Sequence, residues 1–131
     1  MSFTDKITIG WAGDSGTALS KLMSLTADAN EARSVSIADS TTDGVIDLTL
    51  DVSDLVFFLL VANGTITIET NDGTTPDDTF ALTSGVPVLW YAGCGSAIGD
   101  IFSADITALY ATNASGAAVT VDIRLLKDST P

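Results

Sequence analysis

The sequence predicts an all-β fold, an antiparallel β-sandwich or jelly roll of about eight to ten short strands. Apolar and polar side chains alternate with a two-residue period through much of the chain, as in strands that have one buried face. Turn-forming residues recur every eight to twelve residues, which is the spacing of sandwiches. Most of the 17 acidic residues are Asp, which disfavours helix interiors. A length of 131 residues fits one domain, residues 1–131, with no boundary inside it.

The first third of the chain predicts three strands, over residues 6–11, 18–27 and 33–38. A turn at residues 14–16 would join the first two. The leucines and methionine of residues 19–25 also partly fit a helical period. We favour a strand there because the segment lacks helix-capping residues.

The middle of the chain holds the clearest alternation, over residues 45–52, where Ile and Leu alternate with Asp and Thr. The next segment, residues 55–61, is apolar on both faces, so we expect it at the centre of a sheet or at a subunit contact. Phe57, Phe58 and Leu59 are therefore the candidate interface residues. Replacing either phenylalanine with Asp should prevent folding or assembly.

Turn signals predict three hairpins in the remaining sequence. Asn63-Gly64 favours a tight turn with positive φ at both central positions, which gives a hairpin over residues 55–70. Ser84-Gly85 would join strands 79–83 and 86–91. The turn at residues 113–116 would join strands 104–112 and 119–125. We expect the Gly-rich stretch 92–103 to be irregular.

Charge and composition exclude several classes of function. The formal net charge is −12, with 17 acidic and 5 basic residues, and all of this excess lies in residues 28–131. Such a charge opposes binding to nucleic acid or to an anionic membrane. The sequence has no histidine, which removes the commonest general base and the usual zinc ligand. We therefore expect binding or assembly rather than catalysis, with no catalytic residues and no required cofactor.

Other sequence features agree with a protein made in the cytoplasm. The start of the chain has neither the basic residues nor the long apolar run of a secretory signal. Its longest apolar stretch, residues 55–62, is too short to span a membrane. Cys94 is the single cysteine and has no basic neighbour in the sequence, so we interpret it as a structural thiol.

Two weak motifs suggest chemistry. The loop at residues 71–78 offers Asn71, Asp72, Asp77 and Asp78, whose oxygens are the ligands that calcium prefers. Its spacing is not that of an EF-hand, and Asp-rich turns also form by hydrogen bonding to their own backbone. Asp14-Ser15-Gly16-Thr17 matches the short pattern of aspartic proteases, but we favour a plain turn, which explains these residues without a second carboxylate.

The aromatic residues allow a third alternative, a carbohydrate-binding module. Exposed rings beside Asp or Asn can stack on sugars, and Trp11 and Tyr91 are the rings expected to point outward. Trp90 and Tyr110 share their predicted strand faces with aliphatic residues, so we expect both in the core.

The second half of the chain resembles small virion proteins of tailed bacteriophages. The similarity is carried by Gly85-Val86-Pro87 and Trp90 in one predicted hairpin, followed by Asp105-Ile106-Thr107 in a strand. The wider segments that carry it are residues 82–90, 102–116 and 121–124. The resemblance implies a structural subunit with no active site.

Together with the composition, the resemblance leads us to expect a capsid decoration or cement protein that stabilises the phage head. It would be assembled into the virion in the host cytoplasm and would contact the major capsid protein or another virion protein. We expect a homo-oligomer, with a trimer favoured. A tail, neck or fibre component is the alternative within the same class.

Overall fold

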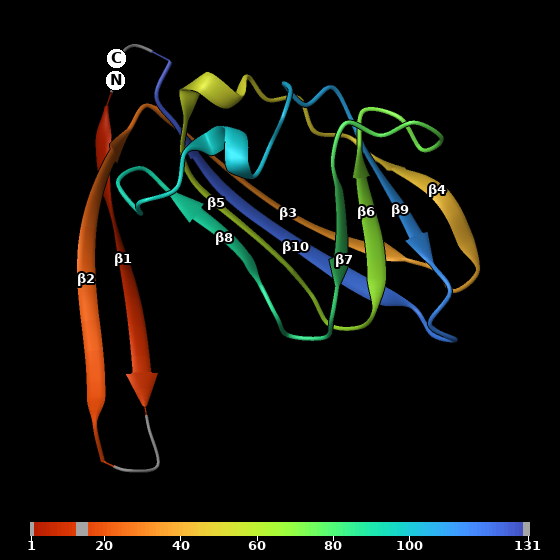
Figure 1. Cartoon of the computed structure of the whole chain (residues 1–131), viewed down its shortest axis with the longest axis horizontal. Coiled ribbons are helices and arrows are strands. Elements are labelled where there is room, and N and C mark those ends of the chain that lie inside the picture. The colour runs from red at the N-terminus through yellow and green to blue at the C-terminus, as the bar shows by residue number, and fades with distance from the viewer. Residues whose placement is uncertain (1, 13–15, 130–131) are drawn as a thin grey trace.

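The computed structural model describes residues 2–12 and 16–129, which form ten β-strands and two short 3-10 helices (Figure 1). The strands are β1 (Phe3–Ala12), β2 (Ala18–Ala27), β3 (Ala29–Ile37), β4 (Thr41–Ile46), β5 (Leu55–Ala62), β6 (Ile66–Thr70), β7 (Thr79–Leu82), β8 (Val88–Tyr91), β9 (Leu109–Asn113) and β10 (Val119–Lys127). The 3-10 helices are η1 (Val52–Asp54) and η2 (Ile98–Asp100). Neither is long and apolar enough to be a candidate membrane span within this described part of the chain.

Eight of the strands form two facing antiparallel sheets. One sheet has the order β3-β10-β5-β8 and the other has the order β4-β9-β6-β7. From β3 to β10, every connection except that from β6 to β7 carries the chain from one sheet to the other. This succession is that of a jelly roll. The all-β, antiparallel sandwich class predicted from the sequence is confirmed.

The core lies between the two sheets and is made of side chains that alternate along the strands. Phe58 of β5 and Ile68 of β6 each point toward the opposite sheet, and both side chains are almost fully buried. Phe102, from the irregular stretch after η2, packs edge-to-face on Phe58 with ring centroids 5.0 Å apart. Because β5 pairs with β10 on one side and β8 on the other, its apolar sequence occupies the sheet interior, as predicted.

The first two strands form a separate two-stranded antiparallel sheet, which we call the arm (β1 and β2). Figure 1 shows it leaving the sandwich near the chain ends and running away from it as a long ribbon. All three strands predicted in the first third are present, and the helical alternative for residues 19–25 is wrong. The turn predicted at residues 14–16 lies largely outside the described residues, since only Gly16 is placed.

The three predicted hairpins are wrong, although most of their strands exist. In each case the chain crosses to the opposite sheet: β5 and β6, β7 and β8, and β9 and β10 are never paired. The hairpin that does form within the sandwich joins β6 to β7 through residues 71–78. A turn signal marks where the chain reverses, but it does not specify which sheet receives the next strand.

The Asn63-Gly64 turn fails as a hairpin signal for a visible reason. Neither residue takes the positive φ that a type I′ turn requires. Instead, the Asn63 side chain accepts a hydrogen bond from the backbone N–H of Thr120 in β10. Gly64 lies so close to β10 that a Cβ built on it would meet Val119 Cγ2 at 2.7 Å.

Two predicted strands are shorter than expected. Over residues 45–52 the alternation of buried Ile46, Leu48 and Leu50 with exposed Asp47 and Asp51 is real, but the regular strand ends at Ile46. Leu50 pairs with Ile106 through an isolated bridge, so the strand predicted at residues 104–112 becomes regular only from Leu109. Side chains in this segment thus continue to alternate between buried and exposed even though the backbone no longer pairs as a regular strand.

Candidate functional site

The arm has one apolar and one polar face, fixed by the register of its two strands. Paired residues share a face, and Phe3↔Ala27, Ile7↔Met23 and Trp11↔Leu19 belong to the apolar face. The opposite face carries Thr4↔Thr26, Lys6↔Ser24 and Thr8↔Leu22, and Leu22 is its one large apolar side chain. The apolar face also carries two charged residues, Asp5 opposite Leu25 and Lys21 opposite Ile9. The arm is therefore amphipathic, with a mainly apolar and a mainly polar face.

The near half of the apolar arm face packs on the outer face of the sheet β3-β10-β5-β8. Ala27, Phe57 and Leu126 form a small buried cluster there, separate from the main core. Phe3, Ile7 and Leu25 from the arm cover this cluster. Hydrophobic burial on the far side of the sheet therefore anchors the base of the arm to the sandwich.

The far half of the same face has no cover from the described residues. Trp11 is 70% exposed and Leu19 is 67% exposed, and they pair directly across the ribbon. Ile9, between them and the packed half, is 36% exposed. Exposed side chains of this size grouped on one surface are unusual for a monomeric soluble protein and mark interaction sites.

A cleft of about 210 Å³ lies where the arm leaves the sheet. Ile7, Phe57 and Leu126 form its apolar part, and Asp5, Glu31 and Arg124 contribute polar groups. The cleft thus lies between the arm and the outer face of the sheet. Its lining is continuous with the cluster that anchors the arm.

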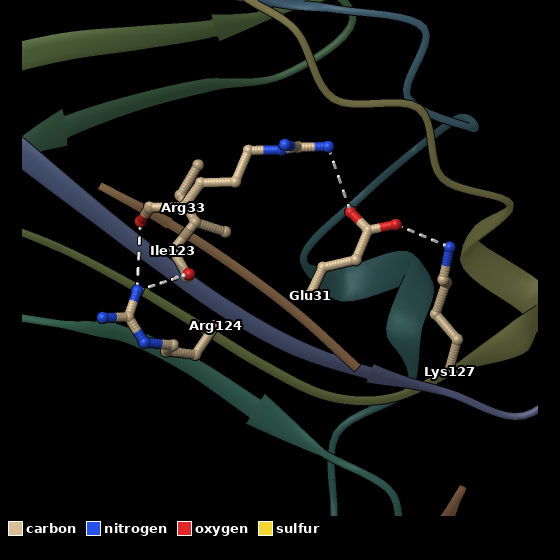
Figure 2. Close-up of polar contacts among 5 residues, drawn as sticks. All are labelled: Glu31, Arg33, Ile123, Arg124 and Lys127. Carbon is tan, nitrogen blue, oxygen red and sulfur yellow. Dashed lines mark hydrogen bonds and ion pairs between the residues drawn. The ribbon is translucent and has the colours of Figure 1, made fainter. Parts of the chain in front are cut away.

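Three of the five basic residues lie on the neighbouring strands β3 and β10, and of these Arg124 lines the cleft (Figure 2). Glu31 lies between Lys127 Nζ at 2.9 Å and Arg33 Nη2 at 3.6 Å. Arg124 Nη1 donates to the carbonyl oxygens of Arg33 at 3.0 Å and Ile123 at 2.9 Å. These contacts tie edge strand β3 to β10, and partly exposed ion pairs of this kind contribute little stability each.

The three candidate interface residues lie in three different environments. Phe58 is 1% exposed inside the sandwich core, so its side chain is not available to a partner. Phe57 is 6% exposed beneath the base of the arm. Leu59 is half-buried at the margin of the same cluster, on the outer face of the sheet. The arm supplies exposed interface candidates that the sequence reading missed: Ile9, Trp11 and Leu19.

The four calcium candidates are engaged in hydrogen bonds within their loop and to residues 103–107. Asn71 Nδ2 donates to Asp77 Oδ2 at 2.6 Å, and Asn71 Oδ1 accepts from the N–H of Thr107 at 2.7 Å. Asp78 Oδ2 accepts from the N–H of Ser103 at 2.9 Å. The NH₂ group of Asn71 thus points at the carboxylate of Asp77. A bound cation would instead need an oxygen of Asn71 on that side. Across residues 2–12 and 16–129, no three or more His, Cys, Asp or Glu side chains are grouped to hold a metal ion.

Two aspartates carry shifted pKa values, and both act as local caps. Hydrogen bonds from the hydroxyl and then the N–H of Ser53 hold the pKa of Asp51 below its usual value. The N–H groups of Thr74 and Thr75 lower the pKa of Asp72 in the same way. Stabilising a carboxylate by nearby N–H donors is ordinary turn chemistry and gives no acid of raised pKa for catalysis.

The aromatic candidates for sugar binding are separated. Tyr91 is half-buried in the cluster under the arm base, whereas Trp11 lies four residues beyond Ile7, roughly 13 Å further along β1. Figure 1 shows the C-terminal ends of β8 and β1 well apart. Trp90 is buried and donates from Nε1 to the Ser96 carbonyl, as its core position requires. Tyr110 is half-buried rather than in the core.

The remaining sequence motifs give no further site. Asp14 and Ser15 of the protease-like pattern lie outside the described residues. Cys94 is half-buried and packs against the main core.

Comparison with known proteins adds no family to this description. No family model matches the sequence, and no curated protein and no solved structure is significantly similar to it.

Proposed function

We propose that this chain is a structural subunit of a tailed-bacteriophage particle, and within that class a decoration or cement protein of the head. It would act as a non-enzymatic homo-oligomer, with three copies favoured, and would contact the major capsid protein or another virion protein. The observation that supports this proposal most is the arm. An apolar surface carried outward on a ribbon suits a protein whose task is to join other subunits.

Three further features support the proposal. The jelly roll is an architecture that viral capsid domains use, although it also occurs in lectins. The acidic body, with all of the net charge of −12 in residues 28–131, would be repelled by packaged DNA and would stay on the outside of a capsid. The resemblance of the second half of the chain to small phage virion proteins points to the same setting.

Localisation on a particle tests the proposal directly. Particles of a phage that encodes this chain would be purified, probed with an antibody against it and viewed by negative-stain electron microscopy. We expect gold label over the head, and we expect heads that lack the protein to release DNA at a lower temperature than complete heads.

The other outcomes separate the alternatives. Label on the tail, neck or fibres would place the chain in the virion but overturn the decoration role. Absence of the protein from purified particles would overturn the whole proposal. In that case a glycan array probed with the wild-type protein and with a Trp11→Ser variant would test the carbohydrate-binding alternative.

A further inference from the structure

We propose that the far half of the arm docks on the outer face of strands β5 and β8 of a second copy of this chain. The inference rests on the proposed structural role, because it names the partner of the same arm. It concerns self-association alone and can be tested without a phage particle.

The far half of the arm continues the face with which the near half already contacts the sandwich. Along the apolar face, the row from Phe3 through Ile7 packs on the outer face of the sheet, and the same row continues through Ile9 to Trp11. Asp5 and, opposite Ile9, Lys21 are the charged residues on this face, and the apolar residues of β1 continue past Lys21 to Trp11. The far half is therefore built for the same kind of surface as the near half.

The far half of the ribbon lacks a packed face of its own. A two-stranded hairpin without a packed face is marginally stable in water. The arm pairs continuously from Phe3↔Ala27 to Ala12↔Ala18, but only its near half is packed on the sandwich. Covering Trp11 and Leu19 would supply the missing hydrophobic contact for the far half.

The sandwich itself offers a matching apolar surface. On the outer face of the sheet, the half formed by β3 and β10 is largely polar, with Asp122 and Arg124. The half formed by β5 and β8 is apolar: Leu59 and Val61 are half-buried, and Leu89 is 38% exposed. Beyond β8, Val86 is 56% exposed.

The opposite sheet offers a smaller apolar surface. Its outward residues include Thr67 and Glu69 of β6 and Thr112 of β9, which alternate with the buried Ile66, Ile68 and Ala111. Val45 of β4, 63% exposed, pairs with the half-buried Tyr110 of β9 on that face. The more extended apolar surface of the sandwich therefore lies on β5 and β8.

Charge favours the same pairing. Residues 1–27 are neutral, with Asp5 and Asp14 balancing Lys6 and Lys21, whereas residues 28–131 carry the whole net charge of −12. Two bodies would repel each other, but a neutral arm approaches an acidic body without that penalty. Each copy thus carries both an uncharged arm and a surface that can receive it.

The surface area buried on association is large enough for a specific interface when each copy both donates its arm and receives the arm of another copy. A ring or a reciprocal dimer satisfies this condition. Covering a tryptophan and its aliphatic neighbours together with the receiving surface, in two such contacts per copy, buries on the order of 1,000–1,500 Å², which is within the range of specific interfaces. A single arm contact would fall below that range.

Sedimentation equilibrium of the purified full chain tests the proposal. We expect the wild-type protein to associate to a whole-number multiple of 13.5 kDa. The double variant Trp11→Ser/Leu19→Ser should associate roughly thirtyfold more weakly or not at all. The matched control is Leu22→Ser, which removes a side chain of similar exposure from the opposite arm face and should behave as wild type.

Chemical cross-linking identifies the receiving surface. In a Cys94→Ser background, one chain carries Leu19→Cys and a second chain carries Leu89→Cys. Mixed under oxidising conditions, the two should form a disulfide-linked pair. A partner chain with Val45→Cys instead, on the opposite sheet, should form far less of it.

The outcomes distinguish this inference from the proposed function. A wild-type chain that stays monomeric, an unchanged assembly in the double variant, or equal cross-linking to residues 45 and 89 would each overturn the inference. A monomeric wild-type chain would also overturn the homo-oligomer in the proposed function, but none of these results would decide whether the protein is part of a phage particle. Conversely, a self-associating chain that is absent from particles would overturn the proposed function and leave the arm contact standing.

Discussion

At the scale of single residues, some residues whose type suggests a local turn instead make contacts between strands that are distant in the sequence. Asn113 is fully buried in β9, and its amide donates to the carbonyls of Ile37 and Ala117 while its oxygen accepts from Ser115. Local sequence places an Asn in a turn, but the contact with Ile37, 76 residues earlier, depends on the fold. Such a residue satisfies buried backbone groups that would otherwise cost stability.

Gly64 gives the sharpest residue-scale prediction. A Cβ at this position would meet Val119 Cγ2 at 2.7 Å, so Gly64→Ala should force β10 or the 63–64 turn to shift. We expect a loss of about 1–3 kcal/mol in the free energy of unfolding, as for overpacking in other cores. Urea denaturation followed by circular dichroism would measure it.

The matched control is Gly99→Ala in η2. No atom lies within 4 Å of a Cβ built on Gly99, and its φ is not positive. Its effect should stay within about 0.5 kcal/mol of wild type, as for ordinary surface substitutions. Equal destabilisation by the two variants would contradict the proposed close approach of Gly64 to β10.

At the scale of elements, the sequence specified strands better than it specified their partners. The alternation of residues 119–125 predicted β10 because the side-chain period is a local property, and the lack of helix-capping residues around residues 18–27 favoured the strand β2 over a helix. The partner of each strand depends on which faces become buried together, and a jelly roll pairs strands that are far apart in sequence. The predicted hairpins at residues 63–64, 84–85 and 113–116 failed for this reason.

The candidate site was only partly predictable for the same reason. The apolar sequence of residues 55–61 correctly marked an important strand, but it did not separate Phe57, under the arm, from Phe58, in the core. The signal that could have found the arm was the apolar row Phe3, Ile7, Ile9 and Trp11 beside a neutral segment. Tertiary packing decides whether such a row of apolar residues packs on the sandwich of its own chain or stays exposed.

Phe57 and Phe58 therefore allow a prediction about elements. Phe58→Asp places a charge in the main core beside Phe102 and should unfold the sandwich. Phe57→Asp should instead release the arm while the sandwich keeps its strands, because Phe57 belongs to the separate cluster under the arm base. Limited trypsin digestion reports this directly, since Lys6 and Lys21 both lie in the arm.

We expect cleavage at Lys6 and Lys21 at least tenfold faster in Phe57→Asp than in wild type, with circular dichroism still characteristic of β structure. Val45→Asp introduces the same charge on the exposed face of the other sheet and serves as the control. If Phe57→Asp lost all β structure, the arm cluster would be part of the cooperative core and the arm could not be treated as a separate element.

At the scale of the whole molecule, two opposing terms govern association. The net charge of −12 makes copies of the chain repel each other, while the exposed arm face favours contact. Salt distinguishes the terms, because it screens repulsion between exposed charges and leaves apolar burial largely intact. The Debye length falls from about 30 Å at 0.01 M to about 10 Å at 0.1 M ionic strength.

Self-association of the wild-type chain should therefore strengthen as salt is raised across this range, even though the arm itself carries two lysines that favour an acidic partner. The body of the protein, residues 28–131, carries the net charge of −12. Screening the repulsion between two bodies is therefore a larger effect than screening the attraction between the lysines and an acidic partner. Sedimentation velocity at the two ionic strengths would measure it, and we expect an association constant several-fold higher at 0.1 M. The Trp11→Ser/Leu19→Ser variant should remain monomeric at both, because screening removes repulsion but supplies no contact. Weaker association of the wild type at the higher salt would mean that the lysines of the arm, rather than its apolar face, hold the copies together.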